Sequence, residues 1–169
     1  MPKTVKLTKE SKAEKIKNKT ALFCRTLLEE DMKTGRYSGR HLCQMHALLS
    51  NHVLNETGIK SKVVGLDFQW LMPTWRGLHY VSKTEDGDYV DALPESNRLI
   101  NADMGEGQVL VLSPSNAKYG VYAEAERRAS LRNWGFISPE RLAENEDQFP
   151  KVLQLYENRI NAFIRENKR

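Results

Sequence analysis

The sequence predicts an α+β fold, in which an antiparallel β-sheet packs on a central helix and further helices follow at the C-terminus. Three observations predict it. A helical apolar pattern precedes several runs rich in β-branched and aromatic residues, two of these runs flank an Asp-Gly turn, and the chain beyond Pro114 returns to helical periodicity. At 169 residues the chain is long enough for one domain with a substantial core.

Two helices are predicted in the first third of the chain. Residues 13–33 carry apolar side chains at helical intervals, and Gly35 and Gly39 break that pattern. Residues 41–55 carry a wider apolar stripe, and Gly58 stands where a left-handed residue commonly ends a helix. The width of the stripe predicts that this second helix is largely buried.

Strands are predicted in the middle of the chain. Residues 60–71 cluster β-branched and aromatic side chains. Residues 77–93 form two alternating arms about Asp86 and Gly87, a pair that suits a tight hairpin turn. Residues 107–113 are mostly apolar, which predicts a strand buried on both faces. Helical patterns follow over residues 123–134, 139–148 and 151–166.

The net charge of +4 is concentrated at the N-terminus. Residues 1–20 are rich in lysine and nearly free of large apolar side chains, so we expect a flexible arm there and a single domain over residues 21–169. The arm offers a weak contact to nucleic acid or an acidic partner, although a solvated tail is the simpler interpretation. Neither a zinc-finger spacing nor an aromatic RNA-binding signature occurs in the sequence.

The cysteine content and hydropathy indicate the compartment. The sequence has no leading apolar segment and no run of about 18 apolar residues, so we expect no contact with a membrane. Its two cysteines, Cys24 and Cys43, are then expected to be free thiols in a reducing, cytoplasmic setting. The oligomeric state leaves no signal in the sequence.

Cys43 lies at the start of the second predicted helix, where the helix dipole favours the nucleophilic thiolate. His79 and Asp91 lie on the two arms of the hairpin, nearly symmetrically about the turn, so we expect their side chains to meet across the strands. A carboxylate that orients an imidazole beside a thiol is typical of nucleophilic acyl transfer. We therefore expect Cys43 as nucleophile, His79 as base and Asp91 as orienting acid. The backbone N–H of Cys43 is the expected oxyanion donor, and no metal or cofactor is required.

Structural interpretations stand beside these roles. Free cysteine commonly packs as a small hydrophobic residue, and a strand histidine or a strand-end aspartate taken alone needs no catalytic role. His41, His46 and His52 raise a metal site as a further alternative, because Cys43 and His46 share a helix face and His41 is near, but no second pair with ligand spacing follows.

Three aromatic residues are candidates for substrate contacts. Trp70 and Trp75 come just before His79 and are interpreted either as core or as the apolar border of a substrate cleft. Tyr37, in the glycine-flanked loop before Cys43, is placed to lend its hydroxyl to the oxyanion site.

The segments "GIKSKVVG", "LHYV" and "YVDALPE", taken with the cysteine that begins the preceding helix, resemble the transglutaminase-like branch of the papain-like superfamily. That superfamily also includes arylamine acetyltransferases and peptide N-glycanases. The resemblance covers residues 35–112 and implies a transglutaminase-like domain in which Cys43, His79 and Asp91 are nucleophile, base and orienting acid. The chain differs from the usual family pattern in having His41 two places before the cysteine and "HYV" in place of "HAW".

The resemblance implies a cysteine-dependent acyl-transfer enzyme that cleaves or modifies peptide or glutamine-type amides. Hydrolysis, as a thiol protease or deamidase, is favoured over cross-linking, because the chain is short and carries no recognisable calcium loop. The alternative is a catalytically silent domain of the same fold, whose cleft or lysine-rich arm binds a partner protein or nucleic acid.

Overall fold

The computed structural model describes residues 10–34, 42–71, 78–132 and 139–168, without the side chains of residues 139–145. Within these residues the fold is mixed α and β, with a four-stranded antiparallel sheet in the order β1-β2-β3-β4, which confirms the predicted class. None of the described helices is long and apolar enough to span a bilayer. The helices are α1 (Lys12–Lys33), α2 (Leu42–Glu56), α3 (Tyr119–Leu131), α4 (Pro139–Leu155) and α5 (Glu157–Asn167), with a 3-10 helix η1 (Pro94–Asn97), and the strands are β1 (Ser61–Leu66), β2 (His79–Thr84), β3 (Tyr89–Asp91) and β4 (Leu110–Leu112).

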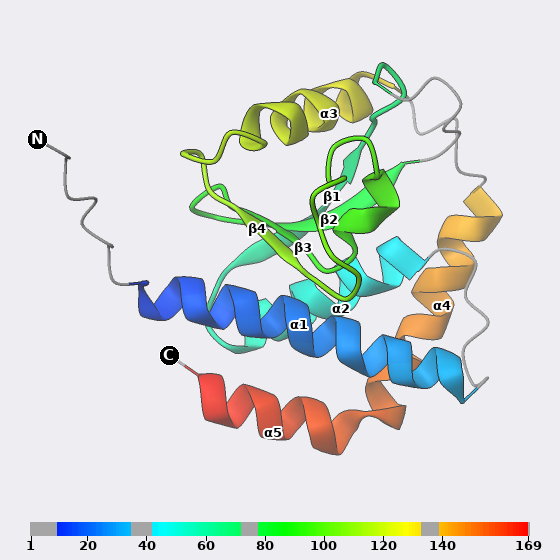
Figure 1. The fold of residues 1–169 in the computed structure, drawn as a ribbon. Coiled ribbons are helices and arrows are strands. Elements are labelled where there is room, and N and C mark those ends of the chain that lie inside the picture. Colours follow the sequence, from blue (N-terminus) through cyan, green and yellow to red (C-terminus); the bar gives the residue numbers. More distant parts are fainter. Residues whose placement is uncertain (1–9, 35–41, 72–77, 133–138, 169) are drawn as a thin grey trace, which may run out of the picture.

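The sheet lies between two layers of helices (Figure 1). Because successive side chains of a strand point to opposite faces, Val81 and Tyr89 pack with Tyr122 of α3, whereas Val90 packs with side chains of α1 and α2. On the outer side of α1 and α2, a further apolar cluster joins them to α4 and α5. Both faces of the sheet are therefore covered, and α2 is largely buried as predicted.

β4 departs from its sequence prediction. Leu110 and Val111 are only half-buried, and Leu112 alone is fully buried, so the expectation of a strand buried on both faces is wrong. Among the described strands β4 pairs with β3 only and forms an edge of the sheet. Its side chains reach the clusters on both faces without being enclosed by either.

The hairpin between β2 and β3 has a three-residue connection. The N–H of Thr84 donates to the carbonyl of Asp88 at 2.9 Å, and the N–H of Gly87 donates to the carbonyl of Thr84 at 2.9 Å. Gly87 has a φ of 96°, in the left-handed region that favours glycine. The turn therefore includes Glu85 in addition to the Asp86 and Gly87 of the predicted tight turn.

This turn sets the register of β2 and β3. Ser82 pairs with Val90 in the β2–β3 ladder. The same register, continued along the strands, places Asp91 opposite Val81. His79 is then the diagonal neighbour of Asp91 on the same face, from where the two side chains meet across the strands as expected.

α1 begins inside the segment 1–20 that was expected to be a flexible arm. The N–H of Glu14 donates to the Ser11 hydroxyl at 3.1 Å, and the N–H of Ser11 donates to the Glu14 carboxylate at 2.6 Å, which forms a capping box. Residues 12–20 are consequently helical and belong to the folded domain. Residues 1–9 lie outside the described residues.

Lys17 is the buried charge that ties this helix to the hairpin turn. Its side chain is 2% exposed, and Nζ donates to the carboxylates of Asp86 at 2.6 Å and Asp88 at 2.7 Å. Burial lowers the pKa of Lys17, but hydrogen bonds and charge interactions with both aspartates outweigh it and raise that pKa above its usual value. The lysine that the composition assigned to a solvated arm therefore holds α1 against the turn.

We expect Lys17→Met to lower the free energy of unfolding by about 3 to 5 kcal/mol, because the buried Asp88 carboxylate loses its countercharge. Urea unfolding followed by circular dichroism measures the change. The control is Lys15→Met at an exposed position of the same helix, for which we expect a change below about 0.5 kcal/mol. A loss below about 1 kcal/mol for Lys17→Met would mean that the ion pair contributes no more than an exposed one.

Candidate active site

Cys43 is the second residue of α2, so its thiol stands in the first turn of the helix. The side chain is partly exposed and packs against the cluster that contains Leu78 and Tyr80. The backbone N–H groups of a first turn have no acceptor within the helix and remain available to an anion. The preceding residues 35–41 lie outside the described residues.

His79 and Asp91 form a buried pair close to this thiol. His79 is the first residue of β2 and is 0% exposed, and Asp91 is the last residue of β3 and is 1% exposed. Imidazole Nε2 lies 2.7 Å from Asp91 Oδ2. The side chains of these diagonal neighbours therefore meet, on the face of the sheet that α3 covers.

Two further groups donate hydrogen bonds to the Asp91 carboxylate. The Tyr122 hydroxyl donates to Oδ2 at 2.8 Å, and the N–H of Leu93 donates to Oδ1 at 2.9 Å. The Asn101 amide donates to the Tyr122 hydroxyl at 3.3 Å and to the Pro94 carbonyl at 2.7 Å. Burial and the Asp91 charge raise the pKa of Tyr122 well above its usual value, so the phenol stays a neutral donor. With the imidazole, the carboxylate has three donors to offset its burial.

The protonation of His79 follows from these neighbours. Burial lowers the pKa of His79, but the charge and hydrogen bond of Asp91 oppose it, and the hydrogen bond and charge of Cys43 add to that opposition. Together they raise the pKa from 6.5 to about 10, so the ring is an imidazolium at neutral pH. Both ring nitrogens then carry a proton. Because Nε2 donates to Asp91, we assign the contact with the Cys43 thiol to Nδ1.

Ser96 makes a second contact with Nδ1, which the sequence did not predict. Its Oγ lies 2.9 Å from Nδ1 of His79, and the imidazolium N–H is the donor. Ser96 is part of η1, which has Pro94 in its first turn. The proline shortly after Asp91 is a sequence signal for a turn at this place.

Arg25 anchors that turn to α1. The buried guanidinium donates to the Ala92 carbonyl at 3.2 Å and to the Gln108 carbonyl at 3.1 Å. It also donates to the Glu95 carboxylate at 2.7 Å, with a second, shorter contact to the other carboxylate oxygen. This arginine lies on the buried face of α1, and its partners are too distant in the sequence to be deduced from any local pattern.

The remaining thiol and the nearest helix histidine are in contrasting environments. Burial raises the pKa of Cys24 to about 12. Burial lowers the pKa of His46 to about 4, although the ring donates from Nδ1 to the Leu42 carbonyl at 2.8 Å. Neither group is charged at neutral pH.

A metal site was the alternative for the histidines of α2. Among the described residues, no group of three or more His, Cys, Asp or Glu side chains is placed to hold a metal ion. His46 is directed to the carbonyl of its own helix rather than toward Cys43. His41 lies outside the described residues.

Of the predicted substrate-contacting aromatic residues, Trp70 alone is described. It is 40% exposed, and the Arg128 guanidinium lies 5.0 Å above its ring, so the interpretation of Trp70 as core is wrong. Trp75 and Tyr37 lie outside the described residues. Phe68, close by in the chain, is buried with its ring centroid 6.4 Å from that of His79.

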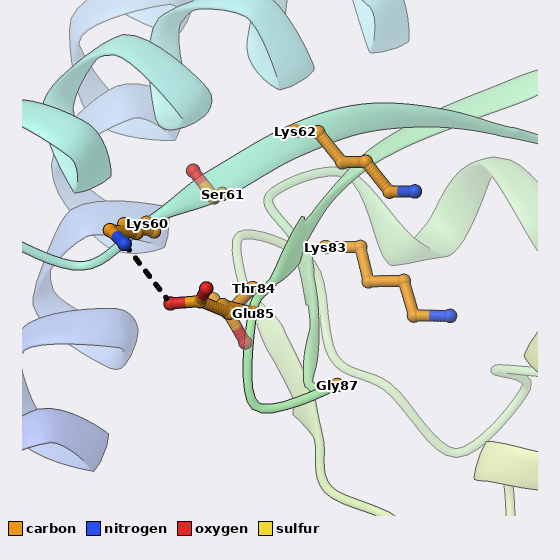
Figure 2. A pocket seen from close by; sticks show the side chains of 7 residues that line it. All are labelled: Lys60, Ser61, Lys62, Lys83, Thr84, Glu85 and Gly87. Atoms are coloured by element: carbon orange, nitrogen blue, oxygen red, sulfur yellow. Dashed lines mark ion pairs between the residues drawn. The ribbon is translucent and has the colours of Figure 1, made fainter.

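A separate pocket of about 400 Å³ opens at the other end of β1 and β2 (Figure 2). Figure 2 shows the side chains of Lys62 and Lys83 extending to the same side, with Lys60 facing Glu85. Two of these lysines are paired, Lys60 with Glu85 at 3.8 Å and Lys83 with Glu126 at 2.6 Å. The pocket is remote from the triad along the strands, because its Ser61 and Thr84 pair at one end of the ladder, whereas Leu66 and His79 pair at the other. Its lining residues are Lys60, Ser61, Lys62, Lys83, Thr84, Glu85 and Gly87.

Comparisons with known proteins add no relative. The chain matches no protein-family model, and no curated protein and no solved structure is significantly similar to it. The resemblance to transglutaminase-like domains therefore rests on the sequence motifs given above.

Proposed function

We propose that the chain is a cysteine-dependent acyl-transfer enzyme of transglutaminase-like architecture, with Cys43 as nucleophile, His79 as proton donor and base, and Asp91 as orienting acid. One observation carries the proposal: the buried His79–Asp91 pair, whose imidazolium also interacts with the Cys43 thiol in the first turn of α2. The order of elements, with a helix followed by two adjacent antiparallel strands, agrees with what the resemblance implies.

The buried pair is better explained by chemistry than by stability. Moving two charges out of water is costly, and a well-packed apolar pair is often at least as stabilising as a buried ion pair. A structural histidine here would need only Asp91 as its partner. The second ring nitrogen instead meets a partly exposed thiol and a hydroxyl. Strongly perturbed groups gathered around a potential nucleophile are typical of catalytic sites.

The first half of the proposed reaction forms a thioester. The Cys43 thiolate attacks the carbonyl carbon of an amide, a C–S bond forms, and the carbonyl electrons move to oxygen, which accepts a hydrogen bond from the N–H of Cys43. As the intermediate collapses, the C–N bond breaks and Nδ1 of His79 gives its proton to the departing amine. The imidazole is then neutral, and Asp91 keeps its orientation through Nε2.

The second half releases the acyl group. A water molecule gives a proton to Nδ1 of His79 and attacks the thioester, the C–S bond breaks, and the thiolate and imidazolium are restored. An amine in place of water completes a transfer instead of a hydrolysis. We propose hydrolysis of a peptide or glutamine-type amide. The exposed ring of Trp70 supports an extended substrate, because it follows β1 at the end of the sheet where Leu66 pairs with His79.

We expect iodoacetamide to alkylate Cys43 at least about tenfold faster than Cys24 at pH 7, because Cys43 is partly exposed beside an imidazolium and Cys24 is buried with a raised pKa. Peptide mapping by mass spectrometry separates the two sites. His79→Ala is expected to slow the alkylation of Cys43 about tenfold, since the countercharge of the thiolate is lost.

The matched control is His52→Ala on the same helix as Cys43, which is expected to leave the alkylation rate within about twofold. Circular dichroism establishes that each variant is folded, and His79→Gln serves in place of His79→Ala if the latter unfolds. A Cys43 rate that does not depend on His79 would refute the triad and favour the catalytically silent, partner-binding alternative.

The histidines are expected to titrate far apart. In nuclear magnetic resonance spectra followed against pH, we expect His79 to keep its proton until about pH 10 and His46 to stay neutral down to about pH 4. Since the folded pKa of His79 lies above its ordinary value, its contribution to stability is complete below about pH 6.5 and is lost as the pH rises toward 10. Asp91→Asn is expected to move the His79 titration downward. A midpoint near 6.5 for His79 in the unaltered protein would contradict the ion pair.

A further inference from the structure

At the candidate active site, one N–H donor of His79 faces two possible hydrogen-bond acceptors. Nε2 of His79 is taken by Asp91 at 2.7 Å, which leaves only the Nδ1 proton for other acceptors. Ser96 Oγ lies 2.9 Å from Nδ1, and the interaction of the Cys43 thiol with the same ring is assigned to this nitrogen as well. The hydroxyl and the sulfur are therefore competing acceptors.

The position of Ser96 is built by the fold. The residue before it, Glu95, is held by the buried Arg25, and the carbonyl of Pro94 accepts a hydrogen bond from Asn101 at 2.7 Å. The turn also begins at Asp91, whose carboxylate accepts from the N–H of Leu93. Ser96 itself is exposed, so water was available to its hydroxyl, yet the hydroxyl is directed onto the buried imidazole.

We propose that Ser96 is a positioning residue of the site, whose hydroxyl accepts a hydrogen bond from the Nδ1–H of His79 while Cys43 is a thiol. When the thiolate forms, the same N–H donates to the sulfur instead. This inference rests on the proposed function. A thiol sulfur is a weak acceptor, so the Nδ1–H donates to the Ser96 hydroxyl as long as Cys43 carries its proton. A thiolate is charged and is then the stronger acceptor.

The competition between Ser96 and Cys43 changes the pH at which the thiolate forms in one direction only. Ser96 stabilises the state with a protonated thiol more than the state with a thiolate, so it moves the formation of the thiolate–imidazolium pair to higher pH. A thiolate that is stabilised less is also intrinsically more nucleophilic. When the imidazole is neutral, after acylation, the same hydroxyl is able to donate to Nδ1, because a hydroxyl is both donor and acceptor. Ser96 is thus able to make a hydrogen bond with the ring both before the thiolate forms and after acylation.

The test is the pH profile of Cys43 alkylation by iodoacetamide in the full chain. We expect Ser96→Ala to move the midpoint of the profile to lower pH by on the order of one unit, the size of one hydrogen bond to a charged group. Ser96→Thr keeps the hydroxyl and is expected to keep the midpoint. Ser130→Ala, at an exposed position of α3, is the control for removal of a serine hydroxyl elsewhere.

The outcomes separate this inference from the proposed function. An unchanged or raised midpoint in Ser96→Ala, while Cys43 still depends on His79, overturns the role of Ser96 and leaves the triad in place. A lowered midpoint in Ser96→Thr as well would also overturn it, because the effect would then not follow the hydroxyl. Cys43 alkylation that is independent of His79 overturns both.

Discussion

The ion pair between His79 and Asp91 is the constraint around which the site is arranged. Both side chains are buried, so the cost of removing their charges from water has to be offset by nearby donors and acceptors. These come from separate elements: Tyr122 from α3, the Leu93 N–H from the turn after β3, and Cys43 from α2. Helices α2 and α3, on opposite faces of the sheet, therefore both contact the His79–Asp91 pair.

A second buried charge at the opposite end of the hairpin explains how its register is kept. Lys17 of α1 meets Asp88 at the turn, while Asp91 meets His79 at the open end. A slip of one residue would turn every side chain of β3 to the other face and break both contacts together. The left-handed Gly87 sets the connection that makes both possible. The geometry of the candidate site is therefore fixed partly by residues at the far end of β2 and β3.

Local patterns in the sequence predicted the parts of the fold that depend on neighbouring residues. The apolar stripe of α2 placed Cys43 in a first turn, and alternation about the Asp-Gly pair placed His79 and Asp91 on adjacent strands. The same pair suits both two-residue and three-residue connections, so the register was not determined. The buried state of Lys17 and the contacts of Ser96 depend on partners distant in the chain. The periodicity of apolar residues carries no information about such partners.

The two cysteines lie in contrasting surroundings. Cys24 and Cys43 both lie on helices, yet one is enclosed in an apolar cluster and the other meets an imidazolium. The helix dipole that acts on a first-turn thiolate contributes about 0.3 to 1 kcal/mol, whereas a hydrogen bond to a charged group contributes about 1.5 to 3 kcal/mol. The second effect is the larger, and it comes from β2 and β3. In the proposed site, the nucleophilicity of Cys43 would therefore depend more on the hairpin than on its own helix, because His79 keeps its charge only where Asp91 reaches it.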